Sequence, residues 1–255
     1  MMEEKIHLFV IGTAGCGKSY FTKAFSEYLD LKRIDHAIVN LDPGADYLPY
    51  TPDVDVREWF TTADVMEKYR VGPNGAQIIS ADLVATKAGD IVDELDLYSA
   101  DYIIIDTPGQ MELFTFRTSS EIIINEFGRN SCVSVYLFDP VISQRASGFM
   151  SMVFLYSSSI FRLRIPQIPA LGKSDLLPEH VTEKIIGWSR DPDKLYDDLI
   201  EENDLSGDLF HMMRDAGLIR PLIPVSSITG NGMDDVYEMV QEIFYAGEDL
   251  ESLRY

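Results

Sequence analysis

Apolar runs of strand length recur along the chain and are separated by segments of helical length. Six of them predict buried strands, at residues 5–11, 36–40, 101–106, 132–139, 167–171 and 222–225. Apolar strands alternating with helices are typical of a parallel sheet with helices on both faces. We therefore predict an α/β fold with an open, mostly parallel sheet. Ligands of such sheets bind at the carboxyl ends of the strands, so we expect the functional residues there.

Two connections are longer than one crossover helix requires. We predict one domain over residues 1–255 with helical insertions at about 43–100 and about 178–217. In the first insertion the pattern predicts a helical piece at 61–69, a break at 72–74 and a long helix through 88–95. The second insertion is dense in Asp and Glu, and we expect a solvated helical subdomain.

A glycine-rich segment follows the first predicted strand and precedes an amphipathic helix predicted at 20–29. It fits the pattern G-x-x-x-x-G-K-[ST] with Gly12, Thr13, Ala14, Gly15, Cys16, Gly17, Lys18 and Ser19, and Tyr20 follows it. Its backbone N–H groups and the helix N-terminus are suited to cradle phosphates. Lys18 would neutralise the β- and γ-phosphates, and the Ser19 hydroxyl would bind Mg²⁺. The segment predicts a P-loop NTPase.

The third predicted strand ends in Asp106, and Gly109 and Gln110 follow three and four residues later. An apolar strand here delivers a carboxylate to the Mg²⁺ side of the phosphates, and Gly109 offers a backbone N–H to the γ-phosphate. A loop with this spacing can order around the γ-phosphate and relax after hydrolysis. Gln110 is then a candidate for orienting the attacking water.

A Lys-x-Asp pattern after the fifth predicted strand indicates the base. The Asp175 carboxylate can accept from guanine N1–H and N2–H₂, a donor pair that adenine lacks, and the stem of Lys173 can lie along the base. Ser226 and Ser227, after the last strand, can present a backbone N–H to guanine O6. We predict at least a tenfold preference for GTP over ATP.

These motifs together resemble those of regulatory GTPases. The tripeptide Gly72, Pro73 and Asn74, placed between the second strand and Asp106, makes the chain similar to the GPN-loop GTPases, in particular the archaeal-type homodimeric members. The resemblance implies a homodimer in which Asn74 of one subunit reaches the phosphates bound by the other. It also implies protein clients, with RNA polymerase assembly as the family role.

The resemblance assigns Asp42 as well. Asp42 is similar to the acidic residue that positions the attacking water in related dimers, and it competes with Gln110 for that role. Asp42 also joins Ser19 and Asp106 as a candidate Mg²⁺ ligand. Some related dimeric nucleotidases have an additional lysine where this chain has Thr13, and an amide donated by a partner's Asn74 would compensate in part.

One position departs from the pattern of regulatory GTPases, which usually have Asn where this chain has Gly172. We expect the change to remove a side chain that ties the base loop to the phosphate loop, with little effect on the base contacts.

Composition restricts the partners. With 42 acidic and 21 basic residues, the formal net charge is −21, and the sequence has no basic run, which argues against nucleic acid as a primary ligand. The two cysteines, Cys16 and Cys132, do not suggest a disulfide. We expect neither a signal peptide at Met1 to Lys5 nor a membrane span, since the longest weakly polar stretch, 146–161, is too short. The expectation is a cytoplasmic protein.

We therefore expect a dimeric GTPase switch that uses Mg²⁺ and converts GTP to GDP. The alternatives are a P-loop kinase similar to polynucleotide kinases and a nucleotide-dependent scaffold without turnover. The segment from Arg145 to Arg164 is rich in Met and aromatic residues. It predicts a helix buried on the sheet, or a groove that opens for a partner peptide.

Overall fold

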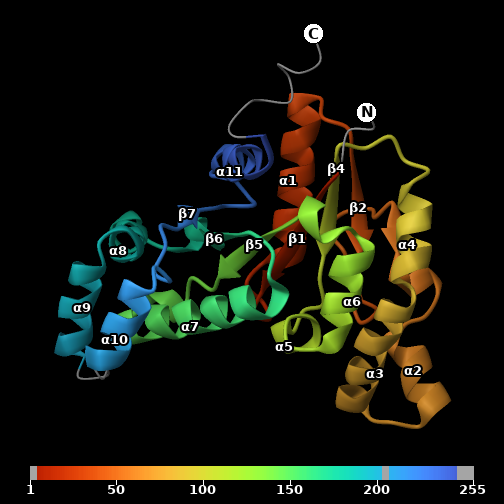
Figure 1. Ribbon diagram of the computed structural model, residues 1–255, viewed down its shortest axis with the longest axis horizontal. Coiled ribbons are helices and arrows are strands. Elements are labelled where there is room, and N and C mark those ends of the chain that lie inside the picture. Colours follow the sequence, from red (N-terminus) through yellow and green to blue (C-terminus); the bar gives the residue numbers. More distant parts are fainter. Residues whose placement is uncertain (1–4, 203–206, 246–255) are drawn as a thin grey trace.

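The computed structural model describes residues 5–202 and 207–245. The expectations for Met1 to Glu4, and the part of the acidic insertion at 203–206, lie outside the described residues. The core is one parallel sheet of seven strands in the order β3-β2-β4-β1-β5-β6-β7 (Figure 1). The strands are β1 (Ile6–Gly12), β2 (His36–Asn40), β3 (Val54–Asp55), β4 (Tyr102–Asp106), β5 (Cys132–Phe138), β6 (Gln167–Leu171) and β7 (Ile223–Pro224). The predicted open parallel sheet is confirmed.

The register brings the carboxyl ends of the central strands together. β1 lies between β4 and β5, with Val10 opposite Asp106 and Gly12 opposite Leu137. Asn40 at the end of β2 also lies opposite Asp106, and on its other side opposite Asp55 of β3. The loops after β1, β2 and β4 therefore leave the same edge of the sheet side by side.

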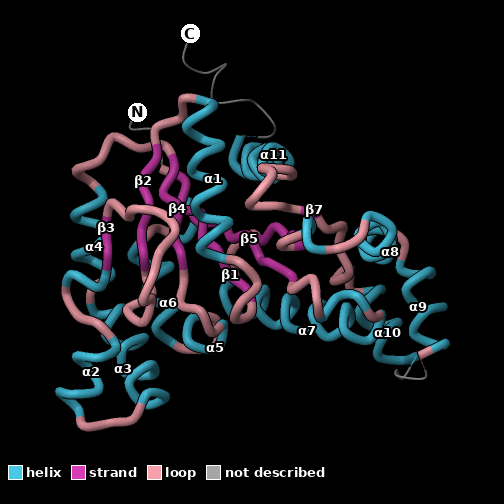
Figure 2. The backbone as a smooth tube through the Cα atoms, turned by 180° about the vertical axis from the view of Figure 1, so that it is seen from behind, coloured by secondary structure: helices cyan, strands magenta, loops and turns pink. Residues whose placement is uncertain are grey.

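Both faces of the sheet are buried, which explains the unbroken apolar strands. Alternate residues of β1 enter different cores, Leu8 and Val10 on one face and Phe9 and Ile11 on the other. The first face is covered by α1 (Lys18–Lys32) and α11 (Met233–Tyr245), as Figure 2 shows. The opposite face carries the larger core.

The first insertion forms α2 (Thr62–Tyr69), α3 (Pro73–Thr86) and α4 (Ala88–Leu95). Thr61 and Asp64 cap α2 reciprocally through side chain and backbone. The predicted break is wrong in one respect. Pro73 and Asn74 belong to the first turn of α3, because proline suits the first helical position, and the turn lies just before them. The long helix is also divided, at Lys87.

The remaining helices follow β4, β5 and β6. They are α5 (Met111–Phe114), α6 (Thr118–Glu126), α7 (Ala146–Leu163), α8 (Glu179–Arg190), α9 (Pro192–Glu201) and α10 (Gly207–Asp215), with short 3₁₀ turns η1 (Val56–Glu58), η2 (Arg129–Ser131), η3 (Ile142–Gln144) and η4 (Ser174–Leu176). The six predicted strands are all present. The short strand β3 was not predicted, because two residues carry no readable alternation.

Helix α7 occupies the segment from Arg145 to Arg164. Phe149, Met150, Val153 and Tyr156 are buried against the sheet side of the core, whereas Phe161 at its end is exposed. The arrangement agrees with the prediction of a buried helix. Across the described parts of the chain, no helix combines the length and apolar character needed to cross a membrane.

Candidate active site

The phosphate loop lies at the carboxyl end of the central strand β1 and leads into α1. Gly12 has φ 149°, and a Cβ there would lie 2.7 Å from the carbonyl oxygen of Leu137. Gly17 has φ 105° at the N-cap of α1. Only glycine adopts these conformations without strain. The loop therefore curls tightly enough to direct its N–H groups and the helix N-terminus to one point.

The other members of the loop have different surroundings. Ala14 is exposed, and Tyr20, in the first turn of α1, is 56% exposed. Cys16 is fully buried, and burial raises the pKa of its thiol, so it is an inert packing residue.

The Lys18 ammonium connects the phosphate loop to the loop after β4. Lys18 is only 6% exposed. Its Nζ donates to the carbonyl oxygens of Gly12 at 2.9 Å, Thr13 at 3.0 Å and Gly109 at 2.7 Å. The last bond joins residues 91 positions apart in the chain. The two loops that the sequence assigned to the phosphates are thus in direct contact.

Asp106 ends β4 beside this lysine and is 1% exposed. Its Oδ2 accepts a hydrogen bond from the Tyr50 hydroxyl at 2.7 Å. Its Oδ1 is buried and has no partner of hydrogen-bond geometry among the described residues. Burial raises the pKa of Asp106 to about 6, and the nearby hydroxyls of Ser19 and Tyr50 and the Lys18 ammonium oppose the rise.

An unpaired buried carboxylate oxygen next to a serine hydroxyl is a suitable half-site for a divalent cation. Mg²⁺ takes oxygen ligands and is usually held by one or two carboxylates together with phosphate oxygens. Ser19 and Asp106 therefore fit that ion, and Asp42 is close enough to raise the pKa of Asp106 through its charge.

Asp42 follows β2 and contacts the same loop as Lys18. Its Oδ2 accepts from the backbone N–H of Gly109 at 3.1 Å, and its Oδ1 accepts from the N–H of Gly44 at 2.9 Å. A cavity of about 130 Å³ opens beside it. The cavity is lined by Ala14, Asp42, Pro43, Gly44, Thr62, Gln77, Ser80, Ala81, Pro108, Gly109, Gln110 and Leu113. Asp42 and Gln110, the two candidates for positioning the attacking water, therefore line the same small cavity.

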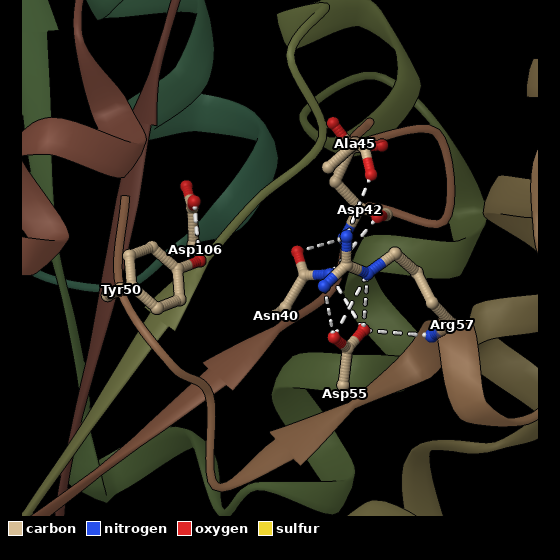
Figure 3. A network of polar contacts seen from close by, with 7 residues as sticks. All are labelled: Asn40, Asp42, Ala45, Tyr50, Asp55, Arg57 and Asp106. Carbon is tan, nitrogen blue, oxygen red and sulfur yellow. Dashed lines mark hydrogen bonds and ion pairs between the residues drawn. The ribbon is translucent and has the colours of Figure 1, made fainter. Parts of the chain in front are cut away.

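A polar network holds the backbone of Asp42 (Figure 3). Asn40 accepts from the N–H of Asp42 at 3.0 Å and donates to its carbonyl at 3.2 Å and to Asp55 Oδ1 at 2.9 Å. Arg57 binds Asp55 through Nε, at 3.0 Å to each oxygen, and through one terminal nitrogen at 2.6 Å. Its other terminal nitrogen donates to the carbonyl of Ala45 at 2.9 Å.

The base loop is bound to the phosphate loop by a lysine. Lys173 Nζ donates to the carbonyl of Gly15 at 2.6 Å, and its stem lies against Gly17. At Gly172 an added Cβ would lie 2.8 Å from the carbonyl oxygen of Cys16. The tie between the loops is therefore present, made by Lys173, and Gly172 allows the two backbones to approach.

A cavity of about 530 Å³ adjoins the base loop. Asp175 and Ser226 line it from the two neighbouring loops. The loops are fastened together by the N–H of Ser174, which donates to Val225 at 3.0 Å. Ser226 is buried and Ser227 partly exposed. The carboxylate predicted to read the base thus faces a space large enough for a ligand.

Asn74 lies apart from these groups. It is exposed in the first turn of α3, and it is absent from the residues lining the cavity beside Asp42, whereas Gln77 and Ser80 of the same helix line it. The connection between α2 and α3, which carries Gly72, projects beyond the edge of the sheet (Figures 1 and 2).

Sequence reasoning missed Tyr50, Asp55 and Arg57. The Asp-x-Arg spacing was a usable signal, because an Asp side chain readily caps a turn by accepting from the backbone N–H two residues later, as Asp55 does from Arg57. For Tyr50 the sequence carried no signal, since its contact with Asp106 spans 56 positions.

The sequence of this chain is similar to those of several known proteins. A family model described as "Conserved hypothetical ATP binding protein" matches residues 10–246. GPN-loop GTPase 1 of Dictyostelium discoideum is 31% identical over 93% of this chain and 61% of its own length. A GPN-loop GTPase of Pyrococcus abyssi is 32% identical over 94% of this chain and 98% of its own. The chain belongs to the GPN-loop GTPase family.

The structures agree with this membership. The crystal structure of the Pyrococcus abyssi GPN-loop GTPase, described as an apo form, matches with a TM-score of 0.81 over 94% of this chain and 98% of that one. This GPN-loop family member spans 61% to 67% of the length of the Dictyostelium discoideum and Schizosaccharomyces pombe relatives named GPN-loop GTPase 1. Its match to the archaeal relative is almost end to end.

Proposed function

We propose that this protein binds GTP with Mg²⁺ and hydrolyses it to GDP and phosphate, acting as a homodimer. GTP binding and hydrolysis rest on membership of the GPN-loop GTPase family. The observation that supports the chemistry is that Lys18 of the phosphate loop and Asp42 both bind Gly109, while Asp106 lies close to the charges of both. Release of phosphate from GTP by the purified protein, abolished in Lys18→Ala, tests it.

The residues divide the work on the triphosphate. The N–H groups of residues 13–19 and the Lys18 ammonium hold the β- and γ-phosphates. Ser19 and Asp106 would hold Mg²⁺, which neutralises charge on the phosphate oxygens. Burial of Asp106 and Lys18 keeps these interactions in a low-dielectric setting, where they are strong.

Asp42 is the residue that we propose to position the attacking water. The N–H of Gly109 carries a single proton, now donated to Asp42 Oδ2. When a γ-phosphate oxygen accepts that hydrogen bond instead, Asp42 Oδ2 becomes free to accept a hydrogen bond from water. In single-turnover experiments, Asp42→Asn should lower the rate of GTP hydrolysis by about 10²–10⁴-fold, the usual contribution of a general base. A larger loss in Gln110→Ala than in Asp42→Asn would assign the role to Gln110.

Guanine is the proposed base, read by Asp175 with Lys173, Ser226 and Ser227. The matching family model names ATP in its description, so competition between the two nucleotides is the direct test. GTP should displace a fluorescent GDP analogue at least tenfold more effectively than ATP, and Asp175→Asn should remove the preference. Equal displacement by ATP and GTP in the wild type would refute guanine recognition.

Asn74 is proposed to complete the site of the partner subunit. Asn74 is exposed in the first turn of α3 and does not line the cavity beside Asp42 of its own subunit, which supports this proposal. Lys18→Ala and Asn74→Ala homodimers should both be inactive. A mixture of the two should regain hydrolysis, because one site per heterodimer then combines an intact Lys18 with an intact Asn74. A mixture that stays inactive despite subunit exchange would mean that Asn74 does not act in trans.

The cellular role we propose is that of a cytoplasmic switch assisting assembly of protein complexes, with RNA polymerase subunits as candidate clients. Ordering of the loops at Asp42 and Gly109 by the γ-phosphate would set the two states of the switch. Pull-downs with the protein locked by a non-hydrolysable GTP analogue, compared with GDP, test this. Label from γ-labelled GTP should appear as free phosphate, and its appearance on an RNA hydroxyl would favour the kinase alternative.

A further inference from the structure

The loop between β2 and β3 sends a tyrosine hydroxyl into the metal side of the site. Tyr50 donates to Asp106 Oδ2 at 2.7 Å, and Figure 3 shows the ring beside that carboxylate, apart from the Asp55–Arg57 group. The ring is partly buried and packs on the core that also contains α1. A phenylalanine would satisfy that packing equally well, so the hydroxyl requires a separate explanation.

The explanation lies in how the two oxygens of Asp106 differ. Oδ2 is occupied by Tyr50, while Oδ1 is buried, has no partner of hydrogen-bond geometry in the described chain, and lies on the carboxylate that Ser19 and Lys18 approach. A buried carboxylate with one oxygen held and one free has a fixed orientation. That orientation leaves Oδ1 as the oxygen available for a cation.

We propose that Tyr50 is a positioning residue for magnesium binding: its hydroxyl holds Asp106 Oδ2 so that Oδ1 is presented to the ion of the nucleotide complex. This inference rests on the proposed function. Groups that hydrogen-bond to a metal ligand set its orientation, and their loss usually lowers metal affinity by 10- to 100-fold.

Tyr50 and Asp42 belong to the same loop, between β2 and β3. Tyr50 lies eight residues after Asp42 in the same loop, so its bond to Asp106 fastens the segment carrying Asp42 to the metal side of the site. Metal binding and the placement of Asp42 are therefore coupled through one hydroxyl.

The test is Tyr50→Phe, which removes one oxygen and keeps the ring. Binding of Mn²⁺ to the GDP complex, followed by electron paramagnetic resonance, should weaken by about 10- to 100-fold. Affinity for a fluorescent GDP analogue in EDTA should stay as in the wild type, which shows that the variant is folded and keeps its nucleotide site. Tyr47→Phe is the matched control, because Tyr47 lies in the same loop but is 73% exposed, and it should bind Mn²⁺ normally.

A double-mutant cycle separates positioning from general support of the fold. If Tyr50 acts through Asp106, then Asp106→Asn combined with Tyr50→Phe should lose no more Mn²⁺ affinity than Asp106→Asn alone. Additive losses, or an unchanged Mn²⁺ affinity in Tyr50→Phe, would overturn the inference and leave the proposed function intact. Absence of saturable Mn²⁺ binding in the wild-type GDP complex would overturn both.

Discussion

Replacing Arg57 by alanine should destabilise the protein and slow hydrolysis together. Arg57 makes a forked contact with Asp55, at 2.6 and 3.0 Å, and a third bond to Ala45. The side chain of Asp55 is only 11% exposed. Removing the guanidinium would leave that carboxylate with Asn40 and one backbone N–H as its remaining donors.

The expected cost is about 2–3 kcal/mol. Hydrogen bonds to charged groups contribute about 1.5–3 kcal/mol, and breaking a fully buried pair costs about 3–5 kcal/mol. The cost is lower than for a fully buried pair because the Arg57 side chain is 27% exposed. Since Asn40 holds the backbone of Asp42, we also expect a fall in kcat with little change in the affinity for GTP.

Arg117→Ala is the matched control. Arg117 makes a similar fork to Asp82, at 2.6 and 3.0 Å, with 29% side-chain exposure, but the Asp82 side chain is 54% exposed. An exposed pair of this kind contributes about 0.2–1 kcal/mol. Urea unfolding at equal protein concentration measures both variants. A cost for Arg57→Ala no greater than for Arg117→Ala would refute the reasoning.

The pH dependence gives a second check on the same pair. Burial raises the pKa of Asp55, but hydrogen bonds from Arg57 and Asn40 outweigh it and leave the pKa below its usual 3.8. A carboxyl group whose pKa is lower in the folded than in the unfolded state stabilises the folded protein at a pH above its unfolded-state pKa. This stabilisation is lost as the pH falls through the folded-state pKa. The difference in unfolding free energy between wild type and Arg57→Ala should therefore be constant near pH 6–7 and shrink below about pH 4.

Three further predictions concern two contacts between loops and one at the start of helix α7. Gly172→Ala should weaken GDP-analogue binding and lower stability by about 1–3 kcal/mol, because its Cβ would lie 2.8 Å from Cys16 O; unchanged fluorescence titration and melting curves would contradict it. Lys173→Met keeps the stem but loses the 2.6 Å bond to Gly15, and it should weaken GDP-analogue binding severalfold, in line with about 1 kcal/mol for one such bond. Glu202→Gln should destabilise by about 1 kcal/mol at pH 7, because the carboxylate accepts the first N–H groups of α7. Burial raises the pKa of Glu202, but hydrogen bonds from the Ser147 hydroxyl and from the two N–H groups outweigh burial and leave the pKa lowered. The difference in unfolding free energy, measured in urea, should therefore diminish as the pH falls below about 4.5; a difference that grows on acidification would argue against it.

Much of the site was predictable because its parts are local. The phosphate loop, the aspartate at the end of β4 and the Lys-x-Asp pattern each occupy a few consecutive residues. Each follows a strand that the apolar pattern predicts. Since parallel strands bring their carboxyl ends to one edge, the meeting of Ser19, Asp106 and Asp175 at that edge followed from the strand order alone.

The contacts that orient these groups depended on tertiary structure. Tyr50 reaches Asp106 across 56 positions, Asp42 reaches Gly109 across 67, and Lys173 reaches Gly15 across 158. Hydrophobic periodicity determines which face of a strand or helix is buried, but it does not determine the path of a loop. The amino-acid sequence by itself therefore determined which chemical groups this protein brings to the sheet edge. Only the folded chain decided which of their atoms are already held and which, such as Asp106 Oδ1, remain available to a ligand.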